Sequence, residues 1–322
     1  MKHVLLGIIA SALICTTGHA QTNYPQRPVK IVVGYAPGGA TDVATRVVAS
    51  EMTKILKQQV IVENRVGGSG TIGMDNVAKS KPDGYTLGMA GVGATAITPY
   101  LDPNPTYIPT RDFTVIGGVY RADFLICARA NLPQKTLQDL LAYAKANPGK
   151  VAYGSVGIAS PNHVQHEELA RLGGATMLHV PYTGESPIVP ALLTGQLDIA
   201  LLTVNAAEPF IREGKIRVLA VGGPNRTPAF PDVPTAADIL GAPDYTANSW
   251  TVLIAPRGTP PAIIETLNNA LNTALALPEV KERFTKMGLS LMSGTSEEAQ
   301  AFVSAEVDRY RKLVKLNDIK RE

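Results

Sequence analysis

Residues 29–42 read VKIVVGYAPGGATD and set the pattern for most of the chain. The run Val29–Tyr35 is apolar and rich in β-branched residues, which is typical of a strand buried on both faces. The loop APGG follows. From Thr41 to Lys57 apolar residues then recur every three or four positions, as on one face of a helix. The stretch therefore predicts a strand, a glycine loop and a helix in succession.

Similar units recur along the chain. Alternating strands and helices of this kind predict a mostly parallel sheet covered by helices. Two series of units predict two α/β lobes, with the chain returning to the first lobe near Trp250. The further strands are expected at residues 60–63, 85–90, 124–128, 151–153, 177–180, 197–203, 216–221 and 289–292. The further helices are expected near residues 74–79, 136–146, 186–193 and 263–275, in a segment ending at Leu172, and in a last segment around residues 302–314 that Thr295 and Glu298 open as a capping box.

Composition limits the classes of function. The 322 residues carry 30 Lys and Arg against 27 Asp and Glu, a formal charge of +3, so no basic surface for nucleic acid or an anionic membrane is expected. A hydrophobic share of 45% with 18% charged residues excludes a disordered chain. The 29 Gly and 24 Pro indicate many tight connections between elements.

The N-terminus has the pattern of an export signal. A basic start at Lys2 and His3 precedes the apolar run Val4–Ile14, which is too short to span a membrane. Small residues at Gly18 and Ala20 predict that residues 1–20 are a signal peptide cleaved after Ala20. Cys127 would then be the single cysteine left, and its apolar surroundings predict a buried, inert thiol.

Four strand-to-helix loops are rich in glycine, at residues 36–39, 67–73, 91–93 and 154–160. Residues 68–73 fit the dinucleotide pattern GxGxxG but have no acidic residue about 20 positions on, and the prolines after residues 91–96 exclude the long helix of such a unit. Tight turns alone are the alternative. Several such loops at strand ends favour a shared binding cleft, where bare N–H groups and helix N-termini suit a carboxylate or phosphate.

Signals for catalysis and metal binding are weak. His163 and His166 lie one helical turn apart beside two glutamates, but the zinc pattern HExxH is absent. Ser155 lacks the spacing of a nucleophile elbow and is expected, with Ser160, to offer a hydroxyl to an anion. Asp42 suits two roles equally well: an acid in the first turn of a helix, or an acceptor facing the cleft. No metal and no cofactor are expected.

The order of several motifs resembles a known family. GYAPGGATD (34–42), VIVENRVGGSGTIG (60–73), KPDGYTL (81–87), HVPYTG (179–184) and IAPRGTP (254–260) follow one another. The chain from Tyr24 onward is similar to the substrate-binding receptors of tripartite tricarboxylate transporters, also called the Bordetella uptake gene family.

This resemblance implies a type II periplasmic binding protein, a Venus flytrap of two α/β lobes with a cleft between them. Lobe I would comprise residues 21–121 and 246–322, and lobe II residues 122–245. The protein would be a monomeric periplasmic receptor, not an enzyme, that closes on a small carboxylate (a di- or tricarboxylate, an acidic amino acid or an aromatic acid) and delivers it to a membrane permease. The implied ligand-binding residues are Tyr35, Ala36, Pro37, Gly38, Gly39, Asp42, Gly91, Ser155, Gly157, Ala159, Ser160, His163, Tyr182, Thr183 and Thr203.

The chain departs from the family pattern at three places. The family commonly has Pro at Gly34, Lys at Thr183 and Gly-Ser at Ala159-Ser160. Residues 36–42 and 155–163 contain no Lys or Arg, so an anion there would be bound by dipoles and neutral donors. Two other functions stay open on the sequence: an exported hydrolase using Ser155 with His163, and a ligand-presenting partner of a membrane sensor.

Overall fold

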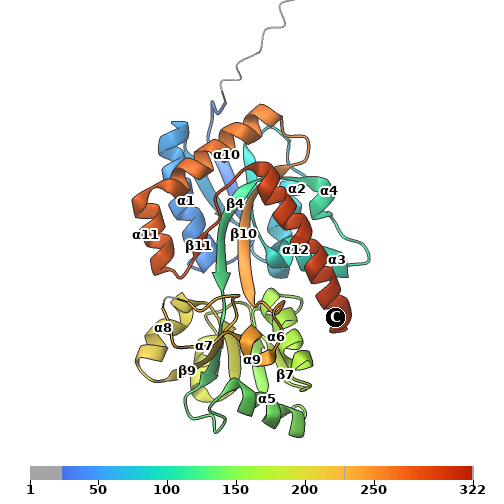
Figure 1. The fold of residues 1–322 in the computed structure, drawn as a ribbon. Helices are drawn as coiled ribbons and strands as arrows, with labels where there is room; N and C mark the ends of the chain where they lie inside the picture. Colours follow the sequence, from blue (N-terminus) through green and yellow to red (C-terminus); the bar gives the residue numbers. More distant parts are fainter. Residues whose placement is uncertain (1–23, 228, 321–322) are drawn as a thin grey trace, which may run out of the picture.

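The strands of this protein form two sheets, and each sheet is the centre of one lobe (Figure 1). The computed structural model describes residues 24–227 and 229–320, so the predicted signal peptide lies outside the described residues. We call the upper lobe of Figure 1, which contains β1, lobe I, and the lower one lobe II. No helix within the described ranges is both long and apolar enough to cross a membrane.

Lobe I is built on a six-stranded sheet with the order β11-β4-β10-β3-β1-β2. Strand β1 lies between β2 and β3 and runs parallel to both. The six strands are β1 (Val29–Val33), β2 (Val60–Asn64), β3 (Thr86–Gly91), β4 (Phe113–Asp123), β10 (Asn248–Pro256) and β11 (Ser290–Leu291).

Helices cover both faces of this sheet because successive side chains of β1 point to opposite sides. Val29, Ile31 and Val33 pack in one core with α1, α10 and α11, whereas Val32 packs in the other with α2, η2 and α12. The helical segments are α1 (Ala40–Leu56), η1 (Gly68–Gly70), α2 (Thr71–Ala78), η2 (Gly93–Ile97), α3 (Thr98–Leu101), α4 (Pro109–Asp112), α10 (Pro261–Ala276), α11 (Pro278–Lys286) and α12 (Ser296–Leu316). The predicted capping box of Thr295 and Glu298 opens α12 and is confirmed.

Lobe II has a five-stranded sheet with the order β7-β6-β8-β5-β9. Helices α5, α6 and α9 pack on one face, and α7 and α8 on the other. Cys127 in β5 is fully buried in the second of these cores, as expected, and burial raises the pKa of its thiol. The elements are β5 (Leu125–Arg129), α5 (Leu137–Ala146), β6 (Ala152–Ser155), α6 (Pro161–Leu172), β7 (Leu178–Pro181), α7 (Ile188–Thr194), β8 (Ile199–Leu202), α8 (Val204–Arg212), β9 (Ile216–Val221) and α9 (Ala236–Leu240).

The prediction of mostly parallel sheets is wrong, because both sheets are mixed. In lobe I, β10 runs antiparallel to β3 and β4, and in lobe II, β5 runs antiparallel to β8 and β9. The chain leaves lobe I along β4 and comes back along β10. Because these two strands are neighbours that run in opposite directions, they must pair antiparallel.

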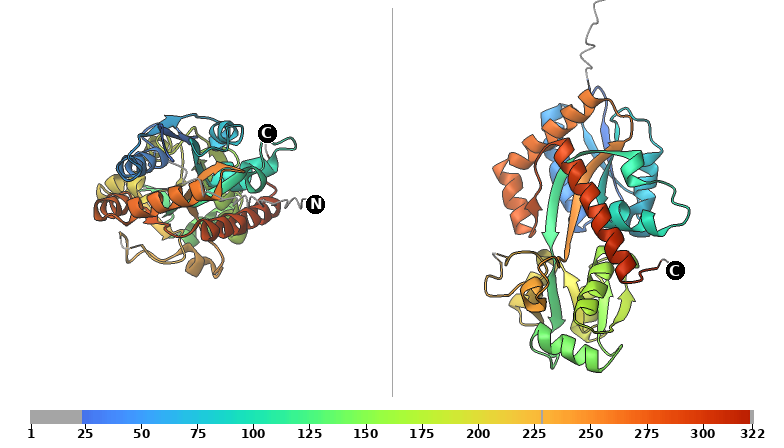
Figure 2. Two further views of the ribbon diagram at one scale, coloured as in Figure 1. Left: turned by 90° about the horizontal axis from the view of Figure 1, so that it is seen from above. Right: turned by 45° about the vertical axis from the view of Figure 1, so that its right-hand side comes forward.

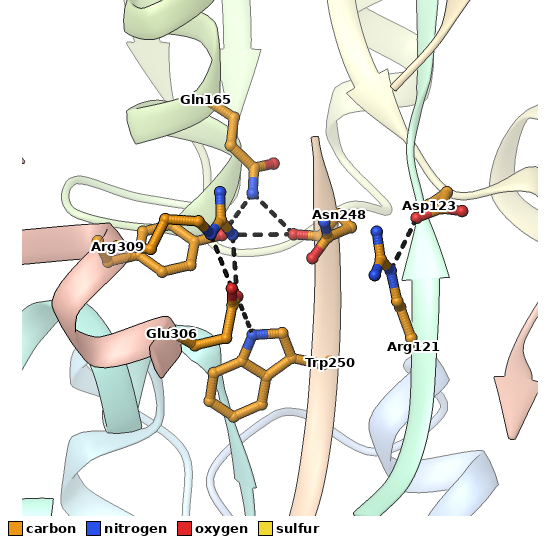
Figure 3. Close-up of polar contacts among 8 residues, drawn as sticks. Arg121, Asp123, Gln165, Asn248, Trp250, Glu306 and Arg309 are labelled. Atoms are coloured by element: carbon orange, nitrogen blue, oxygen red, sulfur yellow. Dashed lines mark hydrogen bonds and ion pairs between the residues drawn. The ribbon is translucent and has the colours of Figure 1, made fainter. Parts of the chain in front are cut away.

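The chain passes from one lobe to the other at Phe124, between β4 and β5, and at Ala247, just before β10. Polar contacts join the lobes beside Asn248 (Figure 3). The domain boundaries expected after residues 121 and 245 stay a prediction. Gln165 of α6 donates to the carbonyl of Asn248 in β10 at 2.8 Å. Helix α12, which runs from lobe I down to lobe II (Figure 2), also contacts this region. Its Tyr310 hydroxyl bonds to Gln165.

Candidate functional site

The exposed loop Ala36–Gly39 joins β1 to α1. Gly38 has φ +82°, and a Cβ built there would meet nothing within 4 Å, so the loop borders open space. Gly39 is the N-cap residue of α1 and, having no side chain, makes no cap hydrogen bond to the first turn. The N–H groups at the start of a helix have no partner inside it and carry a partial positive charge. This end of α1 can therefore bind an anion.

Asp42 supports this loop from its buried side. The residue is 2% exposed, and its carboxylate accepts hydrogen bonds from the Gly38 N–H (2.9 Å), Arg46 (3.0 Å) and Asn64 (2.8 Å). Burial disfavours the charged carboxylate, but these hydrogen bonds outweigh it and leave the pKa of Asp42 below its ordinary value. Of the two roles that the sequence left open, these contacts favour that of a structural acid.

Tyr35 packs inside lobe I against two glycines. Its hydroxyl donates to the carbonyl of Ser69 at 3.2 Å. A Cβ on Gly91 would lie 2.9 Å from the Tyr35 hydroxyl oxygen, and one on Gly70 would lie 3.2 Å from it. Gly70 and Gly91 therefore make room for the tyrosine ring, which explains two of the glycine-rich loops without a nucleotide.

In lobe II, the carboxyl ends of β6, β7 and β8 meet at one edge of the sheet, because these strands are parallel. This edge brings together the predicted site residues Ser155, Tyr182 and Thr203. The Tyr182 N–H donates to the Ser155 carbonyl at 2.9 Å. Ser160 begins α6 and accepts from the His163 N–H at 3.3 Å, and Thr183 is exposed.

The Ser155 hydroxyl does not pair with His163. It lies 2.6 Å from Nε2 of His179 and accepts from the Gly157 N–H at 3.2 Å. His163 instead accepts a hydrogen bond at Nδ1 from the Ala159 N–H, at 3.1 Å. The pair Ser155–His163 that the hydrolase hypothesis requires is therefore absent, because each side chain bonds to another residue.

Aromatic rings stack behind this edge. His163 and His179 lie face to face at 3.9 Å, and Tyr153 stacks on His166 at 4.3 Å. Burial lowers the pKa of His163 and His179 to about 4 and that of His166 to about 3, so all three rings are neutral at pH 7. His166 contacts the Asn162 carbonyl through Nδ1 at 2.9 Å, whereas its Nε2 has no hydrogen-bond partner among the described residues.

These histidines do not form a metal site with the neighbouring glutamates. Glu167 accepts from the Tyr153 hydroxyl, and Glu168 pairs with Arg171 at 2.7 Å. Across residues 24–227 and 229–320, no three His, Cys, Asp or Glu side chains gather as metal ligands would.

Replacing His166 with phenylalanine is expected to flatten the loss of stability in acid. Because folding lowers the pKa of His166 from 6.5 to about 3, the unfolded chain takes up that proton first, and stability falls as the pH drops through this window. Between about pH 6 and pH 4, His166→Phe should remove about 1.4 kcal/mol per pH unit of this slope. Urea unfolding of both proteins at several pH values measures it, and parallel slopes would contradict the assignment.

Glu185 is a residue that the sequence analysis missed. Its carboxylate accepts from the N–H of Thr203 at 2.6 Å and from the Thr203 hydroxyl at 3.0 Å. The donors of this predicted ligand-binding residue are therefore already engaged by the protein's own carboxylate. No motif marked Glu185, because the contact joins the loop after β7 to the end of β8.

The two lobes approach each other at the glycine loops. A Cβ on Gly157 of lobe II would lie 3.7 Å from the Ser69 hydroxyl of lobe I. Ala159 is buried in one core with residues of η2. Its φ is +57°, a left-handed conformation that favours glycine, and the family pattern has glycine there. A separate cavity of about 230 Å³, between α2 and the segment 98–107 of lobe I, is lined by none of the predicted site residues.

Comparison with known proteins gives consistent matches. The family model described as the tripartite tricarboxylate transporter family receptor, TctC, matches residues 44–319. The protein BugT of Bordetella pertussis is 36% identical over 313 residues, 97% of this chain and 95% of BugT. The structure of R. palustris Rpa4515 with adipate is similar with a TM-score of 0.85 and 31% identity, over 92% of this chain and 99% of that one. MatC of Rhodopseudomonas palustris with bound malate has a TM-score of 0.82 and 33% identity, over 90% and 100%.

Proposed function

Because this chain belongs to the tripartite tricarboxylate transporter receptor family, we propose that it is a periplasmic receptor that binds a small carboxylate between its lobes and delivers it to a membrane permease. The family and the structural neighbours are binding proteins, not enzymes. Two of the neighbours were solved with adipate and with malate, both of them small carboxylates.

The observation that carries this proposal is the uncapped N-terminus of α1 behind an exposed glycine loop. A carboxylate placed there would accept hydrogen bonds from free N–H groups. Asp42 holds the loop in shape from the buried side, so little ordering is needed when the ligand arrives. Lobe II would complete the site with the edge at Ser155 and Tyr182, and closure would occur about the passages at Phe124 and Ala247.

A thermal-shift screen tests this function. The ligands are mono-, di- and tricarboxylates, acidic amino acids and aromatic acids, each with its uncharged amide as a control. At 100 times its dissociation constant, a ligand should add about 2.7 kcal/mol to the free energy of unfolding. The melting temperature should rise with the acid and not with the amide. No rise with any of these acids would refute the proposed function.

A pair of variants at Gly39 locates the site. Gly39 has an extended backbone, and a Cβ there would have only an ordinary contact, at 3.6 Å, with the Ala36 carbonyl oxygen. Gly39→Asp should cap α1 with its own carboxylate, which raises the melting temperature of the free protein and abolishes the ligand-dependent rise. Gly39→Ala adds the Cβ without the charge and should keep that rise. A full ligand response in Gly39→Asp would place the site elsewhere.

A further inference from the structure

We propose that Glu185 selects ligands whose far end carries a protonated amine, so that the cargo is an aminocarboxylate and not a dicarboxylate. This inference rests on the proposed function, because it takes the ligand's carboxylate to bind at the start of α1. It concerns the opposite wall of the site, in lobe II.

Thr203 donates both of the hydrogen bonds that Glu185 accepts. The N–H···O distance of 2.6 Å from Thr203 is shorter than an ordinary amide hydrogen bond, as is typical of a charged acceptor. Thr203 is the N-cap residue of α8, so the carboxylate also lies at the positive end of a helix. Each of its two oxygens accepts one hydrogen bond from Thr203, a contact that favours the charged form.

The carboxyl group of Glu185 has no cationic partner in the described parts of the chain. Among the described residues, no Lys, Arg or His side chain forms an ion pair with Glu185. Thr203 supplies neutral donors, and Thr183, two residues earlier in the loop, is neutral. Burial raises the pKa of Glu185 although Thr203 stabilises its charged form, which reflects the cost of a buried charge without a partner. A ligand cation would remove that cost.

Glu185 lies where lobe II meets lobe I. Val204 follows Thr203, the hydrogen-bond partner of Glu185. A Cβ on Gly288 of lobe I would lie 2.7 Å from the Val204 Cβ, so this part of lobe II packs against lobe I. The charge of Glu185 also adds to the effect of burial in raising the pKa of Tyr120, in β4 of lobe I.

Tyr120 connects this region to the proposed carboxylate site. Its hydroxyl lies 2.8 Å from the Thr41 hydroxyl, in the first turn of α1. The start of α1 and the carboxylate of Glu185 are therefore both close to Tyr120, one on each lobe. A ligand that spans them needs a negative group toward α1 and a positive group toward Glu185. The second carboxylate of a dicarboxylate would meet a like charge there.

The simpler alternative is that Glu185 only caps α8. Capping alone predicts that its replacement lowers stability and leaves the choice of ligand unchanged. Selection and capping therefore differ in one measurable quantity, the ratio between the affinities for an aminocarboxylate and for a dicarboxylate. A purely structural role would not alter this ratio.

Calorimetric titration of the purified protein at pH 7 with three matched ligand pairs tests the inference. The pairs are 3-aminopropanoate and succinate, 4-aminobutanoate and glutarate, and 5-aminopentanoate and adipate, which differ only in the far end group. In the pair of the right length, the aminocarboxylate should bind about 30-fold or more tightly than the dicarboxylate. In Glu185→Gln, whose amide oxygen still accepts from Thr203, this ratio should fall at least about tenfold.

Glu213→Gln removes the same charge from an exposed position of lobe II, paired with Lys215, and should keep the wild-type ratio. Tighter binding of the dicarboxylates, no binding of any aminocarboxylate, or an unchanged ratio in Glu185→Gln would each overturn the inference. The first result would leave the proposed function intact. Failure of every carboxylate in the thermal-shift screen would instead refute the proposed function itself.

Discussion

Replacing Trp250 with alanine is expected to lower the free energy of unfolding by about 4 kcal/mol. The side chain is fully buried in β10, and its ring packs edge-on against Phe302 of α12, with 5.4 Å between ring centroids. Its indole N–H donates to Glu306 at 2.7 Å (Figure 3). The substitution removes both of these Trp250 contacts with α12 and leaves a cavity where the ring was. Glu306 keeps its ion pair with Arg309, so the loss is mainly one of packing.

Trp250→Phe separates the two contributions. Phenylalanine keeps most of the ring packing and loses the donor to Glu306, so it should cost about 1 to 1.5 kcal/mol. Denaturant unfolding is best followed by circular dichroism, because Trp250 is the one tryptophan of the chain. An alanine variant within about 1 kcal/mol of the wild type would show that α12 does not depend on this contact.

The elements that could be predicted from the sequence are those with a local pattern. The strand–loop–helix unit at residues 29–57 was predicted because its apolar spacing changes from that of a buried strand to that of a helix within a few residues. The helix expected over residues 136–146 likewise begins next to its capping residue, Thr136. Such signals depend on neighbours in the chain and need no knowledge of the remote partner.

Strand β4 was missed because of its glycines. Gly117 and Gly118 suggest a turn, yet they lie in the middle of an eleven-residue strand. A Cβ on Gly118 would lie 2.7 Å from the Met292 carbonyl oxygen, and one on Gly117 would lie 2.9 Å from Leu271. These glycines therefore permit close packing and do not turn the chain. The partners lie more than 150 residues away, so no local pattern could reveal them.

Helix α8 and strand β10 were missed for other reasons. Pro209 stands inside α8 and normally argues against a helix. The pairing of β10 with β4 joins segments more than 100 residues apart, so its direction follows from the two chain passages and not from either strand alone.

The candidate site could likewise be predicted only in part. The loop at residues 36–39 was predicted from its glycines and the helix that follows. The bonds of His179 to Ser155 and of Glu185 to Thr203 join residues 24 and 18 positions apart, at an edge that exists only after β6, β7 and β8 are aligned. The loops could therefore be located from the sequence, whereas the place of Glu185 in lobe II could be found only from the fold.

Replacing Asp42 with alanine is expected to cost about 3 kcal/mol of stability and to weaken ligand binding about tenfold or more. The substitution removes the acceptor for the Gly38 N–H and leaves Arg46 and Asn64 without their shared partner. The loop before α1 then loses its support and must be ordered by the ligand. Denaturant unfolding and calorimetric titration measure the two losses, and unchanged affinity would show that the loop holds its shape without Asp42.

The pH dependence of the stability loss in Asp42→Ala identifies the cause of that loss. Because hydrogen bonds hold the folded-state pKa of Asp42 below the unfolded value of 3.8, its contribution is complete above that value and is lost as the pH falls through the lower, folded pKa. The gap between wild type and Asp42→Ala should therefore be constant near neutral pH and shrink below about pH 4. Asp238 occupies the same third position of helix α9 but is exposed, so Asp238→Ala is the matched control. A gap that stays constant into acid would indicate that lost packing, and not the lost charge of Asp42, destabilises the loop.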